Sequence, residues 1–462
     1  MIGVLGILLS LGLLMYLAYR GINVLVLAPI LALLAALLGG ETRLLATYTQ
    51  IFMGSLGGFL VKYFPLFLLG AIFGKLMSDS GAAATIAERI IAKLGAKRAV
   101  LAVTLSTAIL TYGGVSVFVV AFAVYPLAIA LFREAKVPKR LIPGALVLGA
   151  ATFTMSALPG TPSVQNAIPM PFFGTDPFAA PGIGVIAGIA MFVLGSLWLG
   201  RRVRLAEQRG ELYGDHPLDH QDAPLVLHRP TLVLALLPIV LVVGVNLVMT
   251  KFAIPAMDVS YLSEKKYGPT TINEVRGIWG LVVALVVAIV AAILLNLRTW
   301  TDLKGSVNHG TMSSLLPIFN TASEVGYGTV IASLTAFAAI QAIVIGIAPG
   351  NPLISEAIAV NVMAGITGSA SGGMGIALNM LGAKYLELGT AAGISPELLH
   401  RVAAIASGGF DSLPHNGAVI TLLGICRLTH RESYLDIFMV SVAGPLVALL
   451  MVLLLGSTFG SF

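Results

Sequence analysis

Long apolar segments recur along the whole chain and limit its possible folds more than any other feature. A helix needs about 20 apolar residues to cross a bilayer, and within the hydrocarbon only helices and closed barrels satisfy their own backbone polar groups. Charged residues make up 10% of the sequence, against about 25% in soluble domains. We therefore predict an all-α polytopic protein in a lipid bilayer. The segments are 2–19, 22–39, 57–77, 99–132, 141–172, 182–200, 231–250, 277–297, 312–345, 353–386, 399–426 and 434–456.

The remaining composition narrows the classes of partner. The net charge is +6, which is typical of membrane proteins whose cytoplasmic loops collect Lys and Arg, and we expect no nucleic-acid partner. The single Cys426 excludes an intrachain disulfide and a cysteine metal cluster. We expect no metal site and no cofactor. The first apolar segment lacks a basic leader and a clear cleavage site, so we expect it to remain in the mature protein.

The segment 99–132 has an unusual length. Its 34 or so residues are too many for one ordinary crossing and too few for two, and basic residues flank both ends. If both ends lie in the cytoplasm, the segment is a re-entrant hairpin with two arms of about 14 residues. Its turn falls at Gly113-Gly114. Non-helical backbone at membrane depth is tolerated where it lines a cavity, so the turn should line a site.

The polar segment 201–229 divides the chain into similar halves. We predict an N-terminal repeat over 1–200, a cytoplasmic linker over 201–230 and a C-terminal inverted repeat over 231–462. Placing the basic segments in the cytoplasm puts the N-terminus outside and starts the second half inside, so the halves have opposite topology. The second half would carry its own hairpin at 353–386.

Three short matches in chain order support a repeat. "SDSGAA" at 78–83 pairs with "SEVGYG" at 323–328, "ILTYGGVSV" at 109–117 with "ITGSASGGM" at 366–374, and "ALPGTP" at 157–162 with "SLPHNG" at 412–417. The spacing between partners is nearly constant. Inverted repeats with substrate near the midplane are typical of secondary transporters.

The third match predicts a broken crossing helix in each half, at 141–172 and 399–426. Proline removes a backbone donor and glycine permits unusual dihedral angles, so "ALPGTP" and "GGFDSLPHNG" interrupt their helices. Freed backbone groups and half-helix N-termini can then face an anionic ligand. An ionisable residue inside a membrane is costly and therefore functional by default.

These considerations select candidate residues and leave simpler roles open. Asp411 could cap the following half-helix, Glu324 could be a surface acid at the end of its span with Asp79 as its counterpart, and the small hydroxyl residues could serve close packing. For coupling we select Asp411, His415 and Glu324. For substrate binding we select Gly113, Gly114, Ser116, Gly160, Thr161, Ser163, Asn166, Asn320, Thr321, Thr367, Ser369, Ser371, Ser412 and Asn416.

Four motifs resemble one family. "GKLMSDSG", "NTASEVGYG", "ITGSASGGMGIAL" and "GGFDSLPHNGAVITLL" together are similar to the gluconate permease (GntP) family of bacterial transporters, and most similar to its branch of hydroxybutyrate and short-chain carboxylate permeases. The resemblance covers essentially the whole chain. It implies membership of the ion transporter superfamily, a homodimer in the bacterial inner membrane, and two opposed hairpins. It also implies inward transport of small hydroxy-carboxylates with protons, and binding positions at Ser369, Ser371, 411–416, Asn320 and Thr321.

The resulting prediction is a secondary active transporter that imports a small anionic hydroxy-monocarboxylate by proton symport with alternating access. Sodium coupling is the close alternative, because the Gly/Ser/Thr tips offer oxygen ligands to a cation. An intramembrane hydrolase built from Asp411, Ser412 and His415 is a remote one. We expect no membrane arginine beside these motifs, so helix ends and hydroxyls would have to neutralise the carboxylate.

Overall fold

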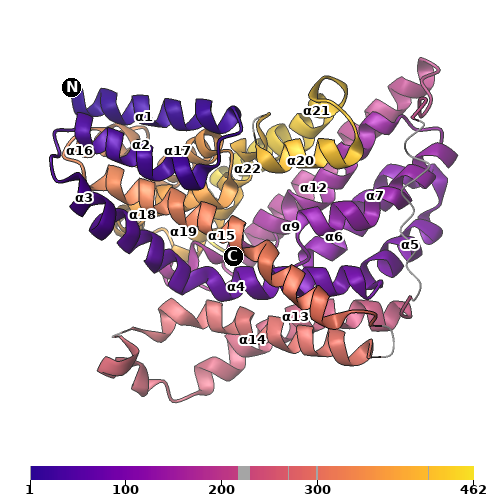
Figure 1. The fold of residues 1–462 in the computed structure, drawn as a ribbon, viewed down its shortest axis with the longest axis horizontal. Helices are drawn as coiled ribbons and strands as arrows, with labels where there is room; N and C mark the ends of the chain where they lie inside the picture. Colours follow the sequence, from indigo (N-terminus) through magenta and orange to yellow (C-terminus); the bar gives the residue numbers. More distant parts are fainter. Residues whose placement is uncertain (1, 217–228, 269, 298–299, 415) are drawn as a thin grey trace.

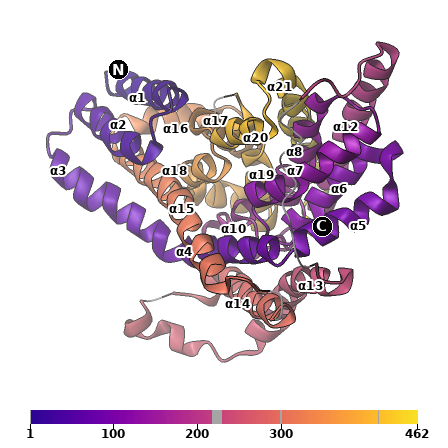
Figure 2. The ribbon, with the colours of Figure 1, turned by 45° about the vertical axis from the view of Figure 1, so that its right-hand side comes forward.

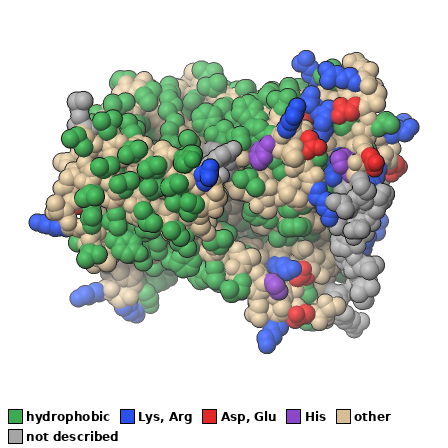
Figure 3. Space-filling model, turned by 45° about the horizontal axis from the view of Figure 1, so that its top comes forward, with side chains coloured by type: hydrophobic (Ala, Val, Ile, Leu, Met, Phe, Trp, Pro, Cys, Tyr) green, Lys and Arg blue, Asp and Glu red, His purple; other side chains and the backbone are tan. Residues whose placement is uncertain are grey.

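The computed structural model describes residues 2–216, 229–268, 270–297, 300–414 and 416–462. Within these ranges the secondary structure is helical and contains no strand. Six helical segments are long and apolar enough to cross a membrane, or eight if each of two sharply bent helix pairs counts as one span. Apolar side chains cover most of one side of the molecule, and many charged ones gather toward one end (Figure 3). The six segments are Leu44–Asp79, Val117–Glu134, Pro181–Gln208, Leu232–Ala256, Ile272–Leu295 and His430–Phe459.

The first half of the chain begins with two packed apolar helices and a long crossing helix (Figure 1). After these come a short amphipathic helix, a helix pair, a series of short helices and a second long helix. In chain order they are α1 (Ile2–Tyr19), α2 (Val24–Leu38), α3 (Leu44–Ala46), α4 (Met53–Asp79), α5 (Ala82–Leu94), α6 (Ala99–Tyr112), α7 (Val117–Glu134), α8 (Ile142–Ala150), α9 (Phe153–Ser156), α10 (Val164–Ala167), α11 (Met170–Phe173) and α12 (Pro181–Gln208).

The second half repeats this order of elements. Its first two helices, α13 and α14, pack side by side along one edge of the molecule (Figures 1 and 2). The helices are α13 (Leu232–Val248), α14 (Ile272–Leu295), α15 (Leu303–Ser333), α16 (Phe337–Gly346), α17 (Pro352–Thr367), α18 (Ala370–Ala391), α19 (Pro396–Ser407), α20 (Gly417–Cys426), α21 (His430–Phe438) and α22 (Gly444–Phe459).

Both predicted hairpins fold as helix–turn–helix units. The first arms begin at Ala99 and Pro352 and the second arms at Val117 and Ala370, so both pairs of starts are 253 residues apart. The second arms, with 18 and 22 residues, are longer than the 14 or so expected. The helix–turn–helix form is therefore confirmed, whereas entry and exit on one side of the membrane remains a prediction.

One apolar segment differs from its prediction. The sequence reads 312–345 as a single run, but the structure divides it between α15 and α16, whose axes differ by 99°. The corresponding bend between α5 and the helix that contains α6 is 105°. The linker also begins later than predicted, because α12 continues to Gln208. Uniform hydropathy hides such bends, since both sides of the bend are apolar.

The two long helices α4 and α15 form the most extensive helix pair in the described structure and run antiparallel. Ser306 near the start of α15 donates to Asp79 at the end of α4, at 2.6 Å. At the other end, the hydroxyls of Ser55 and Thr329 are 2.7 Å apart. Each helix contains an internal proline, Pro65 or Pro317. The N-terminal end of each helix thus lies beside the C-terminal end of the other.

A cluster of ion pairs connects α12, α21 and the segment before α8. Asp436 is fully buried and accepts hydrogen bonds from Trp198 (2.9 Å), Arg202 (2.8 Å) and Arg140 (3.3 Å). Arg140 also pairs with Glu211 at 2.6 Å. The hydrogen bond from Arg140 holds the pKa of the Glu211 carboxyl below its usual value. The cluster holds three separate helical segments together.

The close contact of α4 and α15 gives a stability prediction. A Cβ at Gly310 would come within 2.7 Å of the Ile72 Cα, so Gly310→Ala must push the helices apart. Overpacking of this kind costs about 1–3 kcal/mol, and we expect a lower midpoint in thermal unfolding of the detergent-solubilised protein. Gly58→Ala in α4, where a Cβ meets open space, is the matched control and should not lower it. Equal midpoints for the two variants would contradict the close packing.

Candidate functional site

The C-terminal broken crossing consists of α19, a single 3-10 turn at Phe410–Ser412 and α20. The break begins at Gly408-Gly409, where a Cβ at Gly409 would overlap the Asn361 side chain of α17. Glycine therefore lets the chain approach the second hairpin closely. Pro414 follows, and α20 begins three residues later. The predicted break in 399–426 is confirmed as a break between two helices.

Asn416 holds this break together. Its Oδ1 accepts hydrogen bonds from the backbone N–H groups of Ala418 (2.5 Å) and Val419 (3.0 Å), and so caps α20. Its Nδ2 donates to the carbonyl of Asp411 (2.6 Å) and to that of Gly368 (2.7 Å) at the hairpin tip. One amide thus satisfies backbone groups of the half-helix, the break and the opposing tip.

The tip of the second hairpin also contacts α15. The hydroxyls of Thr321 and Ser371 are 3.2 Å apart, and a Cβ at Gly372 would overlap the Glu324 carboxyl group. Glu324 is only 2% exposed, so it is not a surface acid. Its Oε2, Asn320 Oδ1 and Ser323 Oγ are buried and have no hydrogen-bond partner among the described residues. Buried polar atoms without partners are rare in proteins, and these three gather on one helix beside the tip.

The N-terminal broken crossing has a different construction. Helices α8 and α9 precede an irregular segment, and α10 and α11 follow it. Gly160 has φ +79°, and a Cβ there would meet the Phe178 ring at 2.6 Å, which explains the glycine. Tyr112 at the end of α6 donates to the Pro159 carbonyl at 2.8 Å. In both halves, therefore, a hairpin tip is hydrogen-bonded to a break.

Asn166 lies at the centre of the N-terminal break and is fully buried. Its Nδ2 donates to the carbonyls of Thr161 (3.0 Å) and Pro177 (2.9 Å). Its Oδ1 faces Arg401 Nη1 at 3.0 Å and His400 Nε2 at 3.2 Å, both on α19. These contacts use both hydrogens of Nδ2 and both lone pairs of Oδ1, so Asn166 acts as a support of the break.

Arg401 and His400 are the residues that the sequence analysis missed. Both are fully buried, and the expectation that no arginine lies beside the motifs is wrong. The signal was present, because two ionisable residues stand inside the apolar segment 399–426. Glu356 in α17 is likewise an ionisable residue inside an apolar segment. It is fully buried, and neither of its carboxyl oxygens has a partner in the described structure.

Most selected residues fall into two groups around the breaks. The C-terminal group is joined by the contacts of Asn416, Thr321 and Glu324 described above, and Ser412 donates to Asp411 at 3.1 Å. Asp411 does not cap α20, because Asn416 does. His415 lies outside the described residues. The groups are Asn320, Thr321, Glu324, Thr367, Ser369, Ser371, Asp411, Ser412 and Asn416 in one, and Gly113, Gly114, Gly160, Thr161, Ser163 and Asn166 in the other.

Two sequence assignments change. Ser116 is exposed and caps α7 at 3.5 Å from the Val119 N–H. Asp79 is the last residue of α4 and pairs with Lys75 at 2.9 Å, whereas Glu324 lies well inside α15. The pairing of these two acids is therefore wrong. Matching the internal prolines, "PLF" at 65–67 and "PIF" at 317–319, instead places Ile72 opposite Glu324.

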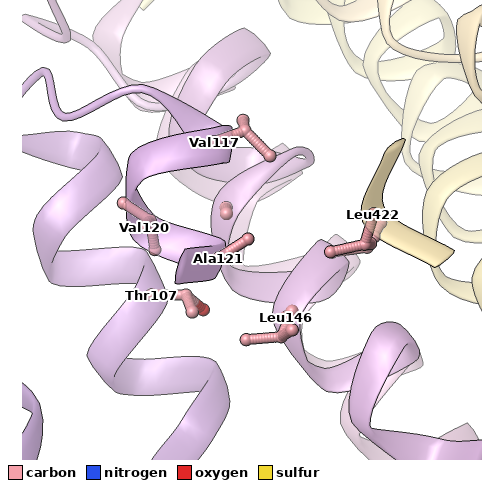
Figure 4. A pocket seen from close by; sticks show the side chains of 8 residues that line it. Thr107, Val117, Val120, Ala121, Leu146 and Leu422 are labelled. Carbon is pink, nitrogen blue, oxygen red and sulfur yellow. The ribbon is translucent and has the colours of Figure 1, made fainter. Parts of the chain in front are cut away.

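A narrow apolar gap, with no room for a water molecule, lies between α6, α7, α8 and α20 (Figure 4). Thr107, Val120, Leu146 and Leu422 are among its lining residues. The lining carries no charged side chain and offers an anion no compensation. Among the described residues, no three His, Cys, Asp or Glu side chains are grouped to hold a metal ion.

Comparison with known proteins gives one family and one fold. The family described as "GntP family permease" matches residues 2–409. The uncharacterized transporter YxjC of Bacillus subtilis is 46% identical over 451 residues, which are 94% of this chain and 95% of that protein. The high-affinity gluconate transporter of Escherichia coli is 29% identical over 208 residues, 44% of each chain. The crystal structure of the Alcanivorax borkumensis YdaH transporter has a similar fold, with a TM-score of 0.55 and 15% identity over 90% of this chain and 89% of that one.

The two functions of Asn416 can be separated. Asn416→Ala removes the α20 cap, at a cost of about 1 kcal/mol, and the tie to Gly368. Asn416→Ser keeps a capping oxygen but is too short to reach the tip. We expect faster hydrogen exchange of the 368–372 amides in both variants, and lower thermal stability chiefly in the alanine variant.

Ser395→Ala is the control for this experiment, because Ser395 caps α19 at 3.2 Å from the Leu398 N–H and does not bond the tip. It should destabilise the protein without changing exchange at 368–372. If exchange at the tip is the same in Asn416→Ser as in the wild type, the tie does not hold the hairpin.

Proposed function

The chain belongs to the GntP permease family, and from this premise we propose that it imports a small hydroxy-monocarboxylate, of the gluconate or 3-hydroxybutyrate type, by proton symport. As a member it is a multi-pass membrane transporter and not an enzyme, which removes the hydrolase alternative. A bacterial relative is described as a high-affinity gluconate transporter. We place the protein in the bacterial inner membrane, as a homodimer.

The observation that carries this proposal is the junction of hairpin tip, broken helix and α15 in the C-terminal half. The positive end of the α20 helix dipole and the hydroxyls of Thr321 and Ser371 can bind a carboxylate and its hydroxyl group. Glu324 is buried next to them and has an unpartnered oxygen. A buried carboxyl group that exchanges a proton near the substrate provides the coupling.

Alternating access is supported by the arrangement of the halves. The elements recur in the same order, the hairpin arms start 253 residues apart, and α4 and α15 run antiparallel. These features are expected of inverted repeats. In that arrangement the two hairpin tips approach the membrane midplane from opposite sides.

Sodium coupling is a second candidate, favoured by one observation. The unpartnered Asn320 Oδ1, Ser323 Oγ and Glu324 Oε2 are oxygen ligands of the kind that hard cations prefer. Proton coupling and sodium coupling therefore involve the same residues. They differ in which external cation drives substrate uptake.

Transport measurements test the function and the coupling together. Proteoliposomes should accumulate labelled gluconate or 3-hydroxybutyrate when an inward proton gradient is imposed. Glu324→Gln and Asp411→Asn should abolish accumulation and retain counterflow, because exchange needs only the loaded carrier to reorient. Asp79→Asn is the matched control and should accumulate substrate normally. Accumulation driven by sodium alone would select the second candidate, and absence of uptake for every hydroxy acid tested would refute the proposal.

The topology is tested by cysteine labelling. In a Cys426→Ala background, Ser116→Cys and Ser371→Cys place single thiols at the two tips. A membrane-impermeant maleimide should label them from opposite sides of the membrane. Labelling of both from one side under all conditions contradicts the inverted repeat.

A further inference from the structure

Arg401 is a charged side chain in the interior of the protein, with 0% exposure. Its Nε and Nη2 donate to the Ala179 carbonyl at 3.0 and 2.7 Å, and Nη2 also approaches the Pro177 carbonyl at 3.5 Å. Its Nη1 donates to Asn166 Oδ1 at 3.0 Å. The neutral oxygens satisfy most of its N–H groups but do not neutralise its charge.

No acid in the described structure forms an ion pair with Arg401. Asp176 is the first carboxylate that interacts with it electrostatically, but Lys251 at 2.8 Å and Arg276 at 3.3 Å already bind Asp176. Lys251 and Arg276 thus contact Asp176, and Arg401 interacts electrostatically with Asp176 and, less strongly, with Glu397 at the exposed start of α19. An uncompensated charge in a protein interior is strongly unfavourable, so the region is suited to an additional anion.

Hydrogen bonds connect Arg401 to the N-terminal break through Asn166. Asn166 Oδ1 accepts from Arg401, and Asn166 Nδ2 donates to the Thr161 carbonyl at 3.0 Å. His400 also faces Asn166 Oδ1 through Nε2, and its Nδ1 is 2.7 Å from the Thr175 hydroxyl. Because an amide oxygen only accepts, Nε2 carries the proton and Nδ1 accepts from Thr175. The His400 ring is thus a neutral support, and the arginine provides the charge.

We propose that Arg401 is the fixed positive charge that compensates the carboxylate of the transported monocarboxylate. It acts as a positioning residue: it holds the 160–166 break through Asn166 and makes the potential there positive, without itself bonding the substrate. The inference rests on the proposed carboxylate transport and adds a source of positive charge that the sequence analysis did not identify. It also explains why a helix of the C-terminal half contributes to the break of the N-terminal half.

The test compares an anion with its neutral analogue. Gluconate and gluconamide, each measured as a competitor of labelled gluconate uptake in proteoliposomes, give the preference for charge. Arg401→Gln should lower the affinity for gluconate about tenfold or more, as expected for loss of one charge in a medium of intermediate dielectric, and leave that for gluconamide nearly unchanged. Arg401→Lys keeps the charge and should retain most of the preference.

A second variant, whose expected effect on the preference for charge is opposite, distinguishes this role from misfolding of Arg401→Gln. Asp176→Asn removes the buried carboxylate that interacts most strongly with Arg401, so it should increase the preference for gluconate over gluconamide. General damage to the site would not produce opposite changes in the two variants. Equal loss of affinity for both compounds in Arg401→Gln, or an unchanged or reduced preference in Asp176→Asn, would overturn the inference. Absence of gluconate and 3-hydroxybutyrate uptake by the wild type would instead refute the proposed function, together with this charge role.

Discussion

Backbone groups that cannot reach water are the constraint on which the rest of this structure depends. A helix that breaks inside a membrane frees N–H and C=O groups, each of which needs a partner there. The protein meets this need with two asparagines, Asn166 and Asn416, because one amide side chain both donates and accepts. Each satisfies groups within its own break and also joins it to a second element. Breaks of this kind can therefore persist in an interior that excludes water.

The sequence predicts the elements of this fold better than their connections. Segment length and basic flanks together predict the first helix–turn–helix unit, because 34 apolar residues fit neither one span nor two. The repeat then predicts the second unit, and Gly-Pro content locates both breaks. Hydropathy cannot reveal the bend before α16, since it leaves the composition unchanged. Alignment of the two halves by their short polar motifs was wrong at one point, because it paired Asp79 with Glu324. Arg401 lies outside the polar motif 408–417 from which the candidate residues of its apolar segment were selected. A charged residue in an apolar segment is nevertheless a strong signal of function.

The two halves share a framework but differ in chemistry. At the positions that the internal prolines bring into correspondence, α15 has Asn320, Thr321 and Glu324 where α4 has leucines and Ile72. Gly74 of α4 approaches the tip of its hairpin, as Glu324 approaches the tip of the other. The tip of one hairpin thus meets a glycine of α4, and the tip of the other meets a carboxyl group of α15. Under the proposed symport, the shared framework would serve the movement and Glu324 would serve the coupling.

A buried positive charge lies at the N-terminal break, and that charge comes from the other half. Because Arg401 on α19 bonds Asn166 in the N-terminal break, neither break can shift alone without separating a buried guanidinium from its acceptors, a loss that the interior makes large. The two breaks are thus expected to move as one body. A body that carries a fixed positive charge near one break and a neutralisable acid near the other suits joint transport of an anion and a cation, because the bound pair leaves its net charge unchanged. Crossing the low-dielectric interior is least costly in that state.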